Sequence, residues 1–484
     1  MKKINALLLA VATLLSILSF TACQIGGTHA MCEKCGRCAI ADCTAEGHEV
    51  KCECALAGTG ELPTYGPLDG PGFHISIFGD PGQQTVEAYQ QLVDMGCDWV
   101  YIDPWSGTNI NSAGLIKALE ACEAVGLNAL IMVNNTHMEK GKETSFLDVA
   151  TIDYTQYPAF KGVYAFDEPD VPQMEWIAND LARWEESIYK DYVYMVNLMA
   201  YAEPEAPTCE IYLDYYWDLV LSKNDDNWLI YDCYPLDAKL GDKVMPYLAE
   251  RQFEFVEEFA KQAKEHDSEL YAYIQTYSEK DGRRREMVSV ADARFQVALD
   301  LAYGIKGFMP FTYIHMSQFG SGLVSGNGEP TDAYYYVQEV FQELRGFENV
   351  FFAFDWEGTM TLLGPNRGTD RGYGEQPETN ITNLVYSLES HDRIKNVDTE
   401  YDLIIGTFKD ENDNDGFLIT SYTDPYYFKD NNISVEFNNA TRALIYYNGE
   451  LLTNDEAGTC YILEDGVLNF DLEAGDYLFV IPVR

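Results

Sequence analysis

The sequence predicts a (β/α)8 barrel, also called a TIM barrel, followed by an antiparallel β-sandwich. Between residues 70 and 350, eight short apolar or aromatic runs alternate with longer stretches of helical periodicity. The runs are nearly continuous in apolar character, as expected of parallel strands buried on both faces. Eight such units favour a closed barrel over an open doubly wound sheet. From residue 384 onward, alternating strands separated by turn sequences replace this pattern.

The barrel is predicted over residues 70–350. Gly96, Gly126 and Gly304 follow helical stretches, where a residue in the left-handed conformation commonly ends a helix and hands over to a strand. A helix over 332–345 is expected to close the barrel. The predicted strands are 74–78, 99–102, 129–133, 163–166, 192–196, 229–231, 271–274 and 308–311.

The C-terminal part is predicted as a linker over 351–383 and a β-sandwich over 384–484. Turn sequences such as Asn414-Asp415-Gly416 and Asn448-Gly449 separate its alternating strands. We expect the sandwich to support and cover the barrel. A glycan-binding role is the weaker interpretation, since the sequence shows no cluster of exposed rings.

The N-terminus predicts export from the cytoplasm. Lys2 and Lys3 precede an apolar run that is long enough for a signal segment but short for a membrane span. The run ends in Phe20-Thr21-Ala22-Cys23, which resembles the cleavage box of bacterial lipoproteins. Residues 1–23 are therefore interpreted as a signal peptide, with Cys23 as the acylated residue. The expected location is the cell envelope or outside the cell, and the lipid anchor is the only membrane contact expected.

Residues 24–65 contain a short cysteine-rich module and a linker. This stretch is too short and polar to form a core, so cross-links must hold it, either a structural zinc ion or disulfides. It resembles a small module found at the start of exported proteins of anaerobic bacteria. No cofactor for catalysis is predicted, because a thiolate-rich zinc site is usually closed. Its cysteines are Cys32, Cys35, Cys38, Cys43, Cys52 and Cys54.

The charge balance excludes a nucleic-acid partner. The chain has 78 acidic and 32 basic side chains and a formal net charge of −46. Such a field repels phosphate backbones and anionic lipid surfaces.

The acidic pair Asp167-Glu168 is the sharpest candidate for chemistry. It follows the predicted strand 163–166, and in a barrel all loops at the carboxyl ends of the strands meet on one face. A buried carboxylic acid beside a second carboxylate has its pKa raised toward neutrality, as a general acid requires. Protonation of a departing glycosidic oxygen is the reaction class that most often uses such a group.

The segment Val163-Tyr164-Ala165-Phe166-Asp167-Glu168-Pro169 resembles the strand-4 Asn-Glu-Pro motif of the large clan of retaining (β/α)8 glycoside hydrolases. It is also similar to the Asp-Glu-Pro variant of exported relatives of the family 42 β-galactosidases. The likeness covers residues 72–484, and it implies that Glu168 is the acid/base of an enzyme acting on an extracellular carbohydrate. An alternative interpretation is that Asp167 caps the next helix while Glu168 forms a surface ion pair.

One position departs from the clan pattern. The nucleophile in that clan is a glutamate at the end of strand 7, where this chain has Gln275. Three explanations stay open. Asp232, after strand 6, could be the partner carboxylate. The N-acetyl group of the substrate could attack, since Tyr231-Asp232 resembles the strand-6 Tyr-Asp of chitinase-type barrels. Finally, the barrel could bind glycans at the cell surface without cleaving them.

Rings and short polar side chains at strand ends predict a cleft for carbohydrate, which offers apolar C–H faces and many hydroxyls. Glu168, Asp167 and Asp232 are the predicted catalytic residues. The predicted substrate-binding residues are Asp103, Trp105, Asn134, Asn197, Tyr231, Tyr234, Gln275, Tyr277 and Tyr313.

Overall fold

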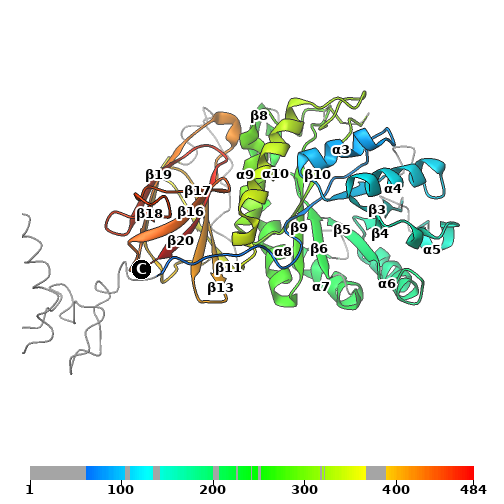
Figure 1. Ribbon diagram of the computed structural model, residues 1–484, viewed down its shortest axis with the longest axis horizontal. Helices are drawn as coiled ribbons and strands as arrows, with labels where there is room; N and C mark the ends of the chain where they lie inside the picture. The colour runs from blue at the N-terminus through cyan, green and yellow to red at the C-terminus, as the bar shows by residue number, and fades with distance from the viewer. Residues whose placement is uncertain are drawn as a thin grey trace, which may run out of the picture.

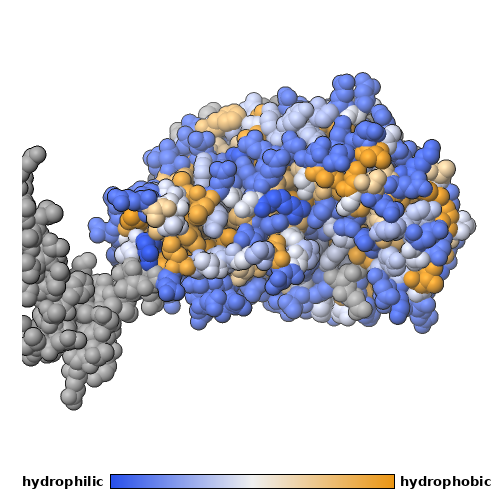
Figure 2. Space-filling view, viewed as in Figure 1, coloured by the Kyte–Doolittle hydropathy of each residue, from blue (hydrophilic) through white to orange (hydrophobic). Residues whose placement is uncertain are grey.

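The computed structural model describes residues 61–103, 109–133, 142–199, 206–224, 227–240, 243–248, 252–316, 319–320, 322–366 and 388–483, with the backbone alone for 238–240, 243–247 and 252–254. In Figure 1 a barrel of blue-to-green strands and helices lies beside a body of orange-to-red strands. The face shown in Figure 2 is largely hydrophilic, with apolar side chains in patches.

Eight parallel strands form the barrel, in the order β1-β10-β9-β6-β5-β4-β3-β2. The ring closes where the continuation of β1 meets β2, because Phe78 bridges Tyr101 in parallel and Tyr101 N donates to Ile77 O at 3.0 Å. The predicted barrel is therefore confirmed. Its strands are β1 (His74–Ile75), β2 (Trp99–Ile102), β3 (Asn128–Met132), β4 (Phe160–Asp167), β5 (Val193–Met199), β6 (Trp228–Asp232), β9 (Glu269–Gln275) and β10 (Gly307–Phe311).

Helices surround the barrel. The helices α3 and α4 end at Gly96 and Gly126, which have φ values of 108° and 82° as predicted for left-handed caps. The closing helix, α10, continues past the predicted residue 345 to Phe351, since Phe347 and Phe351 are buried. No helix in the described ranges is long and apolar enough to cross a bilayer. The helices are α3 (Val86–Met95), α4 (Ala113–Val125), α5 (Phe146–Val149), α6 (Val171–Glu185), α7 (Cys209–Leu219), α8 (Gln252–His266), α9 (Val290–Leu301) and α10 (Asp332–Phe351), with 3-10 turns η3 (Tyr154–Gln156) and η4 (Leu221–Lys223).

The C-terminal part is a sandwich of antiparallel sheets, as predicted. One sheet contains β11, β13, β14, β20, β16, β17 and β18, and the other contains β12, β15 and β19. The strands are β11 (Phe354–Leu362), β12 (Ile394–Thr399), β13 (Leu403–Asp410), β14 (Asp415–Ser421), β15 (Asn431–Phe437), β16 (Arg442–Tyr447), β17 (Glu450–Leu452), β18 (Tyr461–Ile462), β19 (Val467–Leu472) and β20 (Tyr477–Val483), with η5 (Pro425–Tyr427) between β14 and β15. A hairpin of β7 (Leu236–Leu240) and β8 (Lys243–Leu248) follows β6.

The strand β11 corrects the predicted linker over 351–383. It pairs with β13 along its whole length, and the side chains of Phe354 and Met360 are buried. The glycine within β11, Gly358, lies where the register shifts between Trp356 and Gly358, which is a β-bulge rather than the end of a strand.

Barrel and sandwich share one continuous core. The ring of Phe351 on α10 lies 5.4 Å from Phe408 and 5.8 Å from Phe479 of the sandwich. Beside these rings, Arg294 of α9 pairs with Asp476 of the sandwich at 2.7 Å. The sandwich is thus fixed against α9 and α10, which flank the last two strands of the barrel.

A carboxyl group is buried between β6 and α9. Asp300 is 3% exposed, and Tyr231 and Tyr303 are its buried neighbours. Within the described ranges, nothing hydrogen bonds to Asp300 Oδ1 or to the hydroxyls of these two tyrosines. Burial raises the pKa of Asp300 well above its ordinary value. The ionised form is therefore unfavourable in the folded protein.

We expect Asp300→Asn to stabilise the protein. A carboxyl group whose pKa is raised by folding destabilises the fold once the pH exceeds its pKa in the unfolded chain, about 3.9. The free energy of unfolding is therefore not reduced by Asp300 at pH 3, but it is reduced at pH 8. The substitution should raise the free energy of unfolding by roughly 1–3 kcal/mol at pH 8 and change it little at pH 3. Urea unfolding at both pH values measures this, with Asp218→Asn on the exposed face of α7 as the control. Equal stability of wild type and Asp300→Asn at pH 8 would contradict it.

Candidate functional site

The strand β4 ends at Asp167 and presents Glu168 in a strained conformation. Glu168 has φ +51°, in the left-handed region that side-chain-bearing residues seldom adopt. Its N–H donates to Asn197 O at 2.9 Å, which continues the pairing of β4 with β5. A non-glycine residue held in this region is typical of functional sites, where the surrounding structure maintains the strain.

Asn197 of β5 links the carboxylates of the two strands that flank β5, namely β4 and β6. Its Nδ2 donates to Asp167 Oδ1 at 2.9 Å and approaches Asp232 Oδ1, at the end of β6, at 3.4 Å. The hydroxyl of Tyr164, inside the barrel, donates to Asp167 Oδ1 at 2.6 Å. Asn197 is itself 2% exposed, so the arrangement is rigid. The structure thus brings together the three acidic side chains that were predicted as catalytic.

Two of the three carboxyl groups, those of Glu168 and Asp232, have raised pKa values. Burial, followed by the charge of Asp167, raises the pKa of Glu168 to about 7, opposed by a hydrogen bond between the Glu168 and Asp232 side chains. Burial, followed by the charges of Glu168 and Asp167, raises the pKa of Asp232 well above its ordinary value. Two carboxyl groups in hydrogen-bonding contact cannot both be ionised without strong repulsion, so one proton is shared between them.

Aromatic rings form a wall beside these acids. Tyr234 hydrogen bonds to Asp232, and its ring lies 5.1 Å from Tyr277 and 5.8 Å from Phe311. Phe319 extends the wall at 4.7 Å from Tyr277. Tyr234 and Tyr277 were predicted, whereas Phe311 and Phe319 were not. Phe311 is the last residue of β10, so its place at a strand end was a usable signal, but Phe319 lies in an irregular loop.

Gln275 is a structural residue at the end of β9. It is completely buried, and its Oε1 accepts from Leu236 N at 2.9 Å. Its Nε2 faces three backbone carbonyls, those of Leu236, Tyr277 and Arg285, at 3.0, 3.2 and 3.0 Å. The amide therefore joins the loop after β6 to the loop after β9. No side-chain atom of Gln275 is left for a substrate.

Three predicted substrate-binding residues lie apart from the acidic cluster. Tyr231 points outward from the barrel, with its ring stacked 4.3 Å from Phe259 of α8. Tyr313 donates to Gln91 Oε1 at 3.3 Å and lines a separate cavity of about 390 Å³ between the loops after β1 and β10. Asp103 is buried at the end of β2, which is separated from β4 by β3.

Several predictions lie outside the described residues. They concern Trp105 and Asn134 in the cleft, the signal peptide 1–23 with Cys23, and the cysteine-rich part of the module 24–65. The cysteines of that module are Cys32, Cys35, Cys38, Cys43, Cys52 and Cys54. Within the ranges that the structure describes, no group of three or more His, Cys, Asp or Glu side chains is arranged to hold a metal ion.

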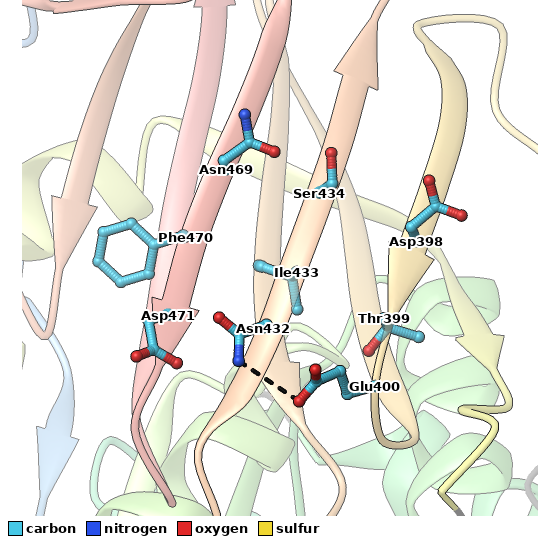
Figure 3. A pocket seen from close by; sticks show the side chains of 9 residues that line it. All are labelled: Asp398, Thr399, Glu400, Asn432, Ile433, Ser434, Asn469, Phe470 and Asp471. Carbon is cyan, nitrogen blue, oxygen red and sulfur yellow. Dashed lines mark hydrogen bonds between the residues drawn. The ribbon is translucent and has the colours of Figure 1, made fainter.

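A cavity of about 510 Å³ lies on the outer face of β12, β15 and β19 (Figure 3). Three of its nine lining residues are acidic, Asp398, Glu400 and Asp471, and Glu400 accepts from Asn432 at 3.3 Å. Phe470 is its single ring and points away from Asp398 in Figure 3. It lacks both the aromatic wall and the shared proton that the barrel end provides, so the barrel end is the candidate site.

No protein-family model matches the chain, and no curated protein matches it. Among solved structures, a putative α-galactosidase from Bacteroides fragilis is 10% identical with a TM-score of 0.48, over 85% of this chain and 79% of its own. A family 39 glycoside hydrolase from Bacteroides cellulosilyticus is 11% identical with a TM-score of 0.39, over 84% and 80%. A β-galactosidase from Marinomonas ef1 is 11% identical with a TM-score of 0.36, over 56% of this chain and 60% of its own. This chain thus spans less than two thirds of that β-galactosidase.

Proposed function

We propose that the protein is a glycoside hydrolase in which Glu168 is the general acid. The observation that carries this proposal is the environment of Glu168, whose pKa burial and Asp167 raise to about 7 at the end of a barrel strand. A carboxyl group with this pKa is protonated at neutral pH and still gives up its proton readily, as protonation of a leaving group requires.

Each neighbouring side chain has a role in this proposal. Glu168 gives its proton to the glycosidic oxygen as the bond from that oxygen to the anomeric carbon breaks. Asp167, oriented by Tyr164 and Asn197, stabilises the positive charge that develops on the sugar ring. Asp232 shares a proton with Glu168 in the resting site through the hydrogen bond between their carboxyl groups. Water then adds to the anomeric carbon, and its proton returns to the carboxyl pair.

Asp232 is assigned to proton sharing rather than to nucleophilic attack. In glycosidases with two opposed carboxyl groups, these groups lie about 5 to 9.5 Å apart, on either side of the scissile bond. The hydrogen bond between Glu168 and Asp232 brings their carboxyl groups closer together than that. The attacking group is therefore water or an acetamido group of the substrate. Comparison of sugars with a 2-hydroxyl and a 2-acetamido group distinguishes these routes.

Carbohydrate is the substrate class that best fits the side chains around the acids. Tyr234 and Phe311, which are half-buried, offer ring faces and edges to the C–H groups of a pyranose, and the buried Tyr277 packs against both rings. Asn197 Oδ1 is buried with no hydrogen-bond partner among the described residues, which leaves an acceptor beside the acids. Together with the signal sequence predicted to end at Cys23, this supports action on an oligo- or polysaccharide outside the cytoplasm, from a lipid anchor. No catalytic cofactor is part of the proposal.

A second candidate function is glycan binding without hydrolysis. The observation that favours it is Gln275, which occupies the place of the clan's nucleophile and is fully engaged by backbone groups. Binding of oligosaccharides with no product after long incubation would support this alternative.

We expect Glu168→Gln to lower turnover of glycosides with poor leaving groups by about 10²–10⁴-fold, because glutamine has no acidic proton to donate. Hydrolysis is measured on a panel of alkyl and aryl glycosides and polysaccharides. Glu175→Gln, on the exposed side of α6, is the matched control and should leave the rate unchanged. Equal turnover by wild type and Glu168→Gln would exclude Glu168 as the acid.

The pH dependence of kcat/KM should follow the protonation of Glu168. Because the acid must be protonated, kcat/KM should fall above a midpoint of about pH 7. Asp167→Asn removes a negative charge that favours the protonated form, so the midpoint should move to lower pH. A midpoint between pH 4 and 5 in the wild type, or an upward shift in the variant, would refute this assignment.

Gln275→Glu should not create a nucleophile. The carboxylate would face three backbone carbonyls that Nε2 now satisfies, so we expect a loss of roughly 1–3 kcal/mol in the free energy of unfolding, with no gain in hydrolysis. Thermal unfolding and turnover are both measured, with Gln342→Glu on the exposed side of α10 as the control. A stable variant with higher activity would show that the end of β9 can supply the nucleophile.

A further inference from the structure

The loop between β14 and β15 of the sandwich exposes two aromatic rings. Tyr426 is 40% exposed and Phe428 is 62% exposed, two residues apart in the segment Asp424-Pro425-Tyr426-Tyr427-Phe428. Phe428 has φ +50°, a left-handed conformation that is rare for a bulky residue. Single exposed rings need no explanation, but a strained backbone that holds a large ring in solvent does.

Buried ion pairs hold this loop to the barrel. Asp424 of the loop and Asp292 of α9 both accept from Arg285 Nη2, at 2.8 and 2.6 Å, and both aspartates are completely buried. Asp424 Oδ1 also accepts from Tyr426 N at 3.0 Å, and the Arg285 guanidinium lies 5.5 Å from the centre of the Tyr426 ring. The Tyr426 ring and the backbone of the loop therefore occupy a fixed position, which lowers the entropy lost when a ligand binds.

The loop lies at the end of the barrel that carries the acidic cluster. Arg285 belongs to the loop after β9, and its carbonyl accepts from Gln275 Nε2 at 3.0 Å. The next residue toward the cleft, Arg284, donates to Tyr234 O at 2.6 Å, and Tyr234 hydrogen bonds to Asp232. A chain of direct contacts thus connects the exposed rings to the catalytic carboxyl groups.

We propose that Tyr426 and Phe428 form a distal binding platform for the glycan, on which uncharged sugar rings stack. Aromatic faces and edges pack against the C–H groups of pyranoses, and the net charge of −46 disfavours acidic polysaccharides. This inference rests on the proposed function and deepens it. It specifies a substrate long enough to reach from Glu168 to the sandwich, that is, a neutral polysaccharide or a long oligosaccharide. The sandwich then contributes to substrate binding as well as to support.

The test measures polysaccharide binding in the full-length Glu168→Gln protein, in which the general acid is removed. Affinity gel electrophoresis with galactan, xylan, mannan and β-glucan provides the neutral probes, and polygalacturonate provides the acidic one. We expect retardation by at least one neutral polymer and none by polygalacturonate. Adding Tyr426→Ala or Phe428→Asn to the Glu168→Gln protein should weaken its affinity for that neutral polymer by about tenfold.

Phe428→Asn separates loss of the ring from loss of the fold. Asparagine adopts the left-handed conformation more readily than phenylalanine, so this variant should unfold at the same or a higher temperature while it binds less tightly. Tyr215→Ala removes a ring that is 42% exposed on α7 and should leave binding unchanged. Unaltered affinity in both platform variants, or no neutral polymer bound at all, would overturn the proposal. Weaker binding by these variants, in a protein whose wild type releases no product, would instead uphold the platform and reject the proposed hydrolysis.

Discussion

The hydrogen bond between Glu168 and Asp232 is the interaction on which the site depends. Both groups are partly buried, and burial together with the charge of Asp167 raises the pKa of each, so that a proton stays between them. The barrel makes this arrangement possible, because closure of the ring places the ends of β4, β5 and β6 side by side. Asn197 and the Tyr164 hydroxyl then fix Asp167 within that group.

Buried polar contacts hold the loops after β6 and β9 in place beside the acids. Gln275 joins the loops after β6 and β9, and Arg285 joins the second of these loops to the sandwich through Asp424. A position that carries a carboxylate in the resembled clan thus serves here as a structural connection. Gln275, at the position of the clan's carboxylate, and Arg285, which holds the sandwich through Asp424, therefore belong to one hydrogen-bonded network.

The barrel strands and the acidic cluster could be predicted because both depend on the local pattern of apolar and polar residues in the sequence. Eight apolar runs gave the barrel strands, and the carboxyl ends of those runs gave Asp167, Glu168 and Asp232. The direction of one side chain was missed, although the local pattern contains it. Tyr231 precedes Asp232 and so points to the opposite side of β6, against Phe259, where a period of two would have placed it. The pairing of Arg285 with Asp424, far along the chain, and the strand β11 with its bulge depend on tertiary contacts that the sequence pattern does not contain.

The most direct test of the central claim is to observe the protonation of Glu168 itself. Carbon-13 NMR of protein labelled at the glutamate side-chain carboxyl groups can follow each group through a pH titration, and the signal missing in Glu168→Gln identifies this one. We predict a main transition near pH 7 for that signal, with a smaller response as Asp232 titrates. A single transition near the ordinary value of about 4.3 would contradict it, since Glu168 would then be ionised at neutral pH and have no proton to donate.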